Sequence, residues 1–161
     1  MTRRTSIPQA LPAPDSPPIG AGRAPSKPAR PKPRELERAE QVAVIKWADG
    51  NAQLKWPELA LLHSVPNGGD RNFIVACKLK GEGLRRGVPD LHLPVARGGY
   101  HSLWIEMKAG AGKPKKHQEW WIARLRDEGH FVAVCWDRHA AINTIADYLE
   151  GKLTKSERSL K

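Results

Sequence analysis

Two short apolar segments separated by a pair of glycines constrain the fold of this chain more than any other feature. Apolar residues alternate with other residues over 90–96 and again over 102–109, and this period is typical of half-buried strands. Gly98-Gly99 lies between them, and glycine readily adopts the positive φ angles that a tight hairpin turn requires. The pattern therefore predicts an antiparallel hairpin in the middle of the chain.

Segments with a helical apolar period surround this hairpin. We predict helices over 35–48, 71–80, 115–128 and 140–149, and strands over 59–65, 90–96, 102–109 and 130–136. Gly50-Asn51 is expected to end the first helix. The order α-β-α-β-β-α-β-α predicts an α/β domain with a central mixed sheet flanked by helices.

The two ends of the chain differ in composition from its centre. Residues 1–34 contain nine of the 14 prolines, which remove backbone donors and leave no regular apolar period. We expect this segment to be a disordered basic tail. A chain of 161 residues has room for one domain, which we place at 35–153, with a short basic tail at 154–161.

Most of the net charge of +10 lies in these tails. Residues 1–34 carry seven basic residues and one acidic residue, and residues 154–161 carry three and one. The stretch 35–153 is nearly balanced, with 17 basic and 15 acidic residues. A basic tail favours a polyanion such as nucleic acid, but a purely solubilising tail is an equal alternative. Charge alone does not identify a function.

Other features exclude whole classes of protein. No run approaches the roughly 18 apolar residues of a membrane helix, and no apolar segment of a secretory signal follows the first residues. Cys77 and Cys135 lie far apart without a metal-binding spacing, so we expect free thiols. The sequence therefore predicts a cytoplasmic protein with no membrane partner.

Two carboxylates and a lysine converge in the predicted hairpin. Glu106 and Lys108 share one face of the second strand with Trp104, and the hairpin returns Glu106 to the neighbourhood of Asp90. Carboxylates hold Mg²⁺, which neutralises charge on a phosphate and lowers the pKa of a bound water. A lysine beside it can orient that water or stabilise the transition state. The backbone carbonyl of Met107 is a further candidate ligand, and the set predicts phosphodiester hydrolysis. The alternative is an ordinary surface Glu–Lys pair.

Two helices are expected to add polar residues to this site. Glu37 and Gln41 lie on the inward stripe of the first helix, where a polar side chain is costly unless it is paired or bound to a ligand. Glu40 lies beside them and is an alternative to Glu37. Gln118 belongs to the apolar face of the helix 115–128, from which it could reach the site.

Basic residues and glycines near the predicted site are candidate contacts to nucleic acid. The basic candidates are Arg85, Arg86, Lys113, Lys115 and Lys116, for which the alternative is a solvated loop. Asn67 and Gly68 could let the nucleic-acid backbone approach closely, and the alternative for them is a plain turn. His63 alternates with apolar residues and is expected in the core. Core packing is also the expectation for most of the six tryptophans, while Trp104 could stack on a base.

Taken together, these residues resemble the virus-type replication-repair nuclease domain (VRR-NUC). This domain is a branch of the PD-(D/E)xK superfamily, which has the restriction-endonuclease-like fold. The resemblance covers roughly residues 35–149. It rests on Glu37 with Gln41, Pro66-Asn67-Gly68-Gly69, Gly87-Val88-Pro89-Asp90, Glu106-Met107-Lys108 and Gln118.

The resemblance implies a division of roles and an activity. Asp90 and Glu106 would bind Mg²⁺ or Mn²⁺, Lys108 would be the catalytic lysine, and Glu37 and Gln118 would complete the site. Stand-alone members look like phage proteins of DNA repair and recombination, and some act as dimers on branched DNA such as Holliday junctions. We therefore expect a metal-dependent endodeoxyribonuclease in a bacterial host cytoplasm. A homodimer, a protein partner of the Pro-rich tail, and a non-cleaving DNA-binding accessory protein remain open alternatives.

Overall fold

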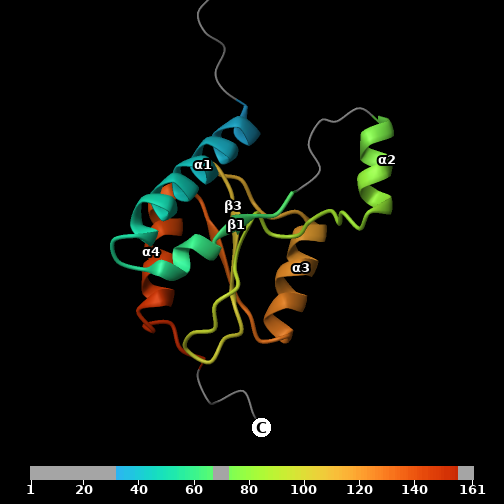
Figure 1. Ribbon diagram of the computed structural model, residues 1–161. Helices are drawn as coiled ribbons and strands as arrows, with labels where there is room; N and C mark the ends of the chain where they lie inside the picture. The colour runs from blue at the N-terminus through green and yellow to red at the C-terminus, as the bar shows by residue number, and fades with distance from the viewer. Residues whose placement is uncertain (1–31, 67–72, 156–161) are drawn as a thin grey trace, which may run out of the picture. The chain divides into compact units, whose positions relative to one another are not determined.

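A computed structural model describes residues 32–66 and 73–155. The N-terminal tail up to residue 31, the glycine-rich turn with Asn67 and Gly68, and residues 156–161 lie outside the described residues. The elements, shown in Figure 1, are α1 Pro33–Ala52, the 3₁₀ helix η1 Pro57–Leu61, β1 His63–Ser64, α2 Phe73–Gly81, β2 Leu91–Leu93, β3 Leu103–Met107, α3 Lys116–Asp127, β4 Phe131–Cys135 and α4 Arg138–Leu149.

The strands form one mixed sheet in the order β1-β2-β3-β4. The pairs β1–β2 and β2–β3 are antiparallel, and β3–β4 is parallel, with α3 as the crossover between them. Gly98 and Gly99 adopt φ angles of 58° and 82° in the turn between β2 and β3, as the hairpin prediction requires. The predicted α/β architecture with a mixed sheet and flanking helices is confirmed.

Helices cover both faces of this sheet. Leu103, Ile105 and Met107 of β3 point into the core, where they join buried residues of α1 and α4 such as Val44 and Ile145. Because side chains alternate along a strand, Trp104 and Glu106 point to the opposite face, the face on which α3 packs against β4. In Figure 1, α1 and α4 accordingly lie together on one side of the strands and α3 lies on the other.

The predicted strand 59–65 is wrong over its first half. Pro57 fixes a helical φ angle at the start of the segment, and Pro57–Leu61 forms a 3₁₀ helix whose three-residue period buries Leu59 and Leu62. Only His63–Ser64 pairs with β2. The expectation that His63 lies in the core is also wrong, because its side chain is exposed at the edge strand.

Other boundaries differ by a few residues. The first helix does not end at Gly50-Asn51 but continues to Ala52, and the Asn51 side chain donates to the Trp47 carbonyl oxygen at 2.8 Å. The strand predicted over 90–96 ends at Leu93, because Pro94 has no N–H to donate to a ladder.

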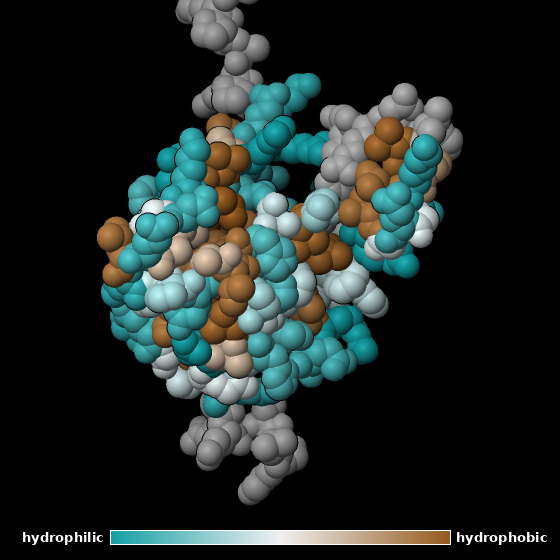
Figure 2. Space-filling model, in the orientation of Figure 1, coloured by the Kyte–Doolittle hydropathy of each residue, from teal (hydrophilic) through white to brown (hydrophobic). Residues whose placement is uncertain are grey.

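The surface carries several exposed apolar residues. Figure 2 shows hydrophilic residues over most of the visible face, with hydrophobic residues gathered down the middle of the domain and over α2. Trp120 and Trp136 are 59% and 46% exposed, so core packing is the wrong assignment for these two tryptophans. Both cysteines are free thiols, as predicted. Within the described ranges, no helix is long and apolar enough to cross a membrane.

Candidate active site

The candidate site is built around the end of β3. Glu106 lies on β3 with 0% of its surface exposed, and Lys108 follows the strand with 6% exposed. The Lys108 N–H donates to the Cys135 carbonyl oxygen of β4 at 2.8 Å, which continues the strand pairing to this residue. A buried carboxylate and a buried ammonium are costly unless each has partners. The sequence placed them on one face, and the structure brings them into contact.

Asp90 reaches the site from the start of β2. Its Oδ2 accepts a hydrogen bond from the Met107 N–H at 2.8 Å, so the carboxylate is fixed to the backbone between the two other site residues. The approach depends on Gly87, which has a φ of 95° and lies so close to α3 that a Cβ atom there would be 2.6 Å from the His117 carbonyl oxygen. The predicted meeting of Asp90 with Glu106 and Lys108 is therefore present.

Glu106 has one bonded and one open carboxylate oxygen. Its Oε1 accepts hydrogen bonds from Lys108 Nζ and from Gln118 Nε2, while Lys108 Nζ also donates to the Met107 carbonyl oxygen at 2.8 Å. Gln118 Oε1 in turn accepts from the Lys115 N–H at 2.9 Å, which ties the amide to the first turn of α3. Gln118 thus reaches the site from the helix face that the apolar period indicated.

The electrostatics of the site disfavour an ionised Glu106 when no cation is present. Burial, together with the negative charges of Asp90 and Glu37, raises the pKa of this carboxyl to about 7, although Lys108 acts in the opposite direction. A site with this balance gains from an added positive charge. In the unfolded chain the pKa of the same carboxyl would be near the usual glutamate value of 4.5.

The residues fit a magnesium-type ion. Glu106 Oε2 is buried and has no hydrogen-bond partner within residues 32–66 and 73–155, so it is oriented as an open ligand atom. Asp90 lies close enough to Glu106 to raise its pKa, and the Met107 carbonyl shares the Lys108 ammonium with Glu106 Oε1. Mg²⁺ typically takes only one or two protein carboxylates and keeps several waters. This donor set agrees with the finding that the described residues contain no group of three or more His, Cys, Asp and Glu side chains arranged for a metal.

The two candidate glutamates of α1 have different partners. Glu40 accepts hydrogen bonds from the Arg138 N–H at 2.7 Å and from the Arg138 guanidinium at 2.9 Å, so it joins α1 to the start of α4. Glu37 is half-buried and raises the pKa of Glu106 through its charge. The geometry favours Glu37 as the residue of α1 that acts on the site, although it does not complete a three-carboxylate group.

The predicted basic contacts surround the start of α3. Lys113, Lys115 and Lys116 are exposed in the preceding loop and first turn, where Trp136 Nε1 donates to the Gly112 carbonyl oxygen at 2.8 Å. Arg85 and Arg86 are exposed immediately before Gly87. The lysines therefore lie on the segment that leads to Gln118, and the arginines on the segment that leads to Asp90.

Sequence reasoning missed three residues of α3 that line a pocket with Arg85 and Arg86: His117, Trp120 and Trp121. A signal was available, because the apolar stripe of this helix runs through residues 118, 121, 122 and 125, and residue 120 lies off it. Ile122 is the buried member of that stripe, and Trp120 points away from it.

Trp104 lies beside three histidines on the same side of the sheet as Glu106. Its ring is stacked on His92, with 3.8 Å between centroids and 16° between planes. Burial, together with the nearby His63 and His130, lowers the pKa of His92 to about 4. One face of the Trp104 ring is therefore already in contact with a neutral imidazole.

Comparison with known proteins agrees with this geometry. The sequence model of the VRR-NUC domain matches residues 31–137. A solved structure described as a VRR_NUC domain protein is similar to this chain at a TM-score of 0.61 and 29% sequence identity. The match covers 71% of this chain and 88% of that structure. A search of curated proteins finds no significant match.

Proposed function

This chain belongs to the VRR-NUC domain family of nucleases, and from that premise we propose that it is a Mg²⁺- or Mn²⁺-dependent endonuclease that hydrolyses DNA phosphodiester bonds. The observation that carries the proposal is the buried Glu106, with Oε1 bonded to Lys108 and Gln118 and with Oε2 open. A nuclease needs such an open oxygen ligand next to a positioned cationic donor.

Each side chain of the site has a separate task in this mechanism. Asp90, Glu106 and the Met107 carbonyl would hold the divalent cation, which supplies charge neutralisation at the phosphate and a more acidic bound water. Lys108 keeps its ammonium at the same point and can donate to a phosphate oxygen or to the attacking water. Gln118 holds the Glu106 carboxylate in one orientation, because its amide is itself fixed to α3.

The direction of substrate approach follows from the basic residues. The cationic side chains Arg85, Arg86, Lys113, Lys115 and Lys116 are exposed on the two segments that border the site. Phosphates of a DNA backbone can contact them while one phosphate reaches Lys108. We propose branched DNA as the substrate class, with a Holliday-junction-like structure as one member.

The direct test is cleavage of blunt duplex, flap and four-way-junction DNA in Mg²⁺, Mn²⁺ and EDTA. We expect cleavage only with metal, and a loss of at least about 100-fold in Asp90→Asn, Glu106→Gln and Lys108→Met. Glu119→Gln removes an exposed carboxylate of α3 and serves as the matched control, with activity near wild type. Cleavage by the Glu106→Gln protein at the wild-type rate would refute the assignment of Glu106 to the active site.

The second candidate is a DNA-binding accessory protein of the same fold. The exposed arginines and lysines that border the site would bind DNA whether or not the site cuts it. That protein would bind with a steep salt dependence and show no metal-dependent turnover.

Sedimentation of the same samples, with and without DNA, tests whether the active species is a homodimer. Deleting residues 1–31 tests whether the N-terminal tail contributes to DNA affinity.

A further inference from the structure

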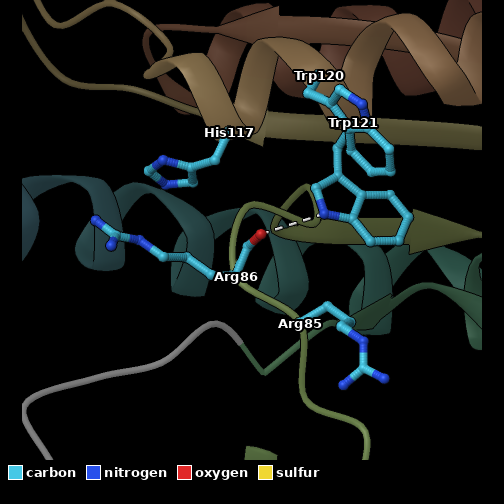
Figure 3. A pocket seen from close by; sticks show the side chains of 5 residues that line it. All are labelled: Arg85, Arg86, His117, Trp120 and Trp121. Carbon is cyan, nitrogen blue, oxygen red and sulfur yellow. Dashed lines mark hydrogen bonds between the residues drawn. The ribbon is translucent and has the colours of Figure 1, made fainter.

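An open pocket of about 420 Å³ lies beside the candidate active site. It is formed by the turn before Gly87 and by the first two turns of α3, and its lining residues are Arg85, Arg86, His117, Trp120 and Trp121. Figure 3 shows the Trp121 indole next to this turn, with the Arg86 side chain extending toward the side on which the His117 imidazole lies. None of the described residues that line the pocket is acidic.

The pocket combines a fixed ring with an exposed ring. Trp121 Nε1 donates to the Arg86 carbonyl oxygen at 3.2 Å, which holds this indole against the turn. The Trp120 ring is nearly perpendicular to it, at 87° and with 5.4 Å between centroids, and 59% of the residue is exposed. A large exposed indole is costly in water and is a favourable surface for a planar, apolar group.

The charges of the pocket specify what kind of planar group fits. The two arginines give the lining a positive charge, and each guanidinium can bind a phosphate through two parallel hydrogen bonds. A single nucleotide carries both a flat base, which can contact an indole, and an anionic phosphate, which can contact an arginine. In a continuous duplex each base is stacked between its neighbours, so only an unpaired nucleotide can present its face to Trp120.

The pocket and the site share the same structural elements. His117, which lines the pocket, precedes Gln118, which bonds Glu106. Gly87, which lies three residues before Asp90, packs against the His117 carbonyl oxygen. Through Gln118 and Asp90, the two segments that line the pocket therefore both continue into the candidate active site. A strand held at Lys108 could therefore continue into the pocket.

We propose that this pocket binds an unpaired DNA nucleotide next to the cleaved phosphodiester, with its base against Trp120 and its phosphate at Arg86. The proposal rests on the nuclease function above and narrows its substrate to DNA in which a strand leaves the duplex near the cut. Trp120 is a binding residue for that strand and takes no part in the hydrolysis.

The test measures binding of the full chain in EDTA, so that metal-dependent cleavage does not interfere. Three labelled duplexes are compared by fluorescence anisotropy: a blunt duplex, one with a three-thymidine overhang, and one with an overhang of three abasic residues. Stacking of one base is worth about 1–3 kcal/mol, so we expect the thymidine overhang to bind roughly 10-fold more tightly than the abasic overhang.

Variants then separate stacking from charge. Trp120→Ala should remove the preference for thymidine over abasic residues and leave binding of the blunt duplex unchanged, whereas Trp120→Phe should retain most of the preference. Arg86→Gln should weaken both overhang duplexes and reduce the salt dependence. Arg124→Gln removes an exposed arginine at the far end of α3 and is the matched control, with no selective effect on either overhang.

The following results would overturn the proposal. They are equal binding of thymidine and abasic overhangs by the wild type, an equal loss on all three duplexes in Trp120→Ala, and a change in self-association of Trp120→Ala without DNA. The last result would assign the pocket to a second copy of the chain. Binding to no duplex at all would overturn the pocket assignment too. If the preference is present but no metal supports cleavage, only the proposed function fails.

Discussion

Replacing Glu106 with glutamine should remove the contribution of this carboxyl to the pH dependence of folding stability of the metal-free protein. In the folded protein the pKa of this carboxyl is about 7, because it is buried and lies close to the negative charges of Asp90 and Glu37, whereas the usual value for a glutamate is 4.5. Between these two pH values this carboxyl binds more protons in the folded protein than in the unfolded chain. Its contribution to stability therefore falls as the pH rises through this interval.

The size of the effect follows from the two pKa values. Each pKa unit corresponds to about 1.4 kcal/mol, so ionisation of Glu106 should cost the folded state about 3 kcal/mol between pH 4.5 and 7.5. The glutamine variant cannot ionise there. We expect the stability of Glu106→Gln relative to wild type to rise by about 3 kcal/mol over this interval, whatever their difference at pH 4.5.

Urea unfolding in EDTA, followed by circular dichroism at several pH values, measures this difference. With a urea dependence of about 2 kcal/mol per molar, the wild-type midpoint should lose about 1.5 M relative to the variant. The control is Glu119→Gln, which removes an exposed carboxylate and should follow the wild-type curve. Parallel curves for wild type and Glu106→Gln from pH 4.5 to 7.5 would refute the reasoning.

Adding Mg²⁺ at pH 7.5 extends the same test to the metal. A cation that binds only the folded protein stabilises it by an amount that grows with its concentration. The wild-type midpoint should therefore increase with Mg²⁺, and the Glu106→Gln midpoint should respond much less. Equal responses would place the ion elsewhere on the protein.

Five further substitutions, two of them controls, test the geometry around the site. Gly87→Ala should cost about 3 kcal/mol in urea unfolding because its Cβ meets the backbone of α3, whereas Gly110→Ala, at a φ of 55° in open space, should cost about 1 kcal/mol. Glu37→Gln should lower the cleavage rate, while Glu40→Gln should leave the rate unchanged and cost at most about 1 kcal/mol of stability, since its ion pair with Arg138 is partly exposed to solvent. Gln118→Leu should reduce the rate roughly 10- to 100-fold with DNA binding retained, because it frees the orientation of the carboxylate.

The elements with a clear local period were predictable from the sequence. The alternation over 90–96 and 102–109 gave both strands and the faces of Glu106 and Lys108, and the apolar stripe 118, 121, 122 and 125 placed Gln118 toward the sheet. Each of these features depends on residues that are neighbours along one strand or one helix. A single periodic pattern then determines which side chains share a face.

Where a segment has two compatible readings, the sequence was insufficient. In Pro57–Leu61 the apolar leucines suit a strand, but the proline favours a helical start, and the position of Leu59 in the core decides between them. Similarly, the pair Trp120 and Trp121 suits a buried helix face only for one of its members. The correct choice depends on which face the sheet covers, and this is set by residues far away in sequence.

The two glutamates of α1 show the same limit within the active site. Glu37 and Glu40 are three residues apart, so they lie on nearly the same face of the helix, and no local rule separates them. Arg138, 98 residues after Glu40, neutralises that carboxylate at the start of α4. The charge of Glu37 instead adds to the charges of Asp90 and Glu106, around one partly compensating lysine. Like charges gathered at a buried point destabilise the metal-free fold, and a divalent cation bound there would offset them. The distribution of partners, more than the number of acidic residues, therefore favours this point for a metal-dependent reaction.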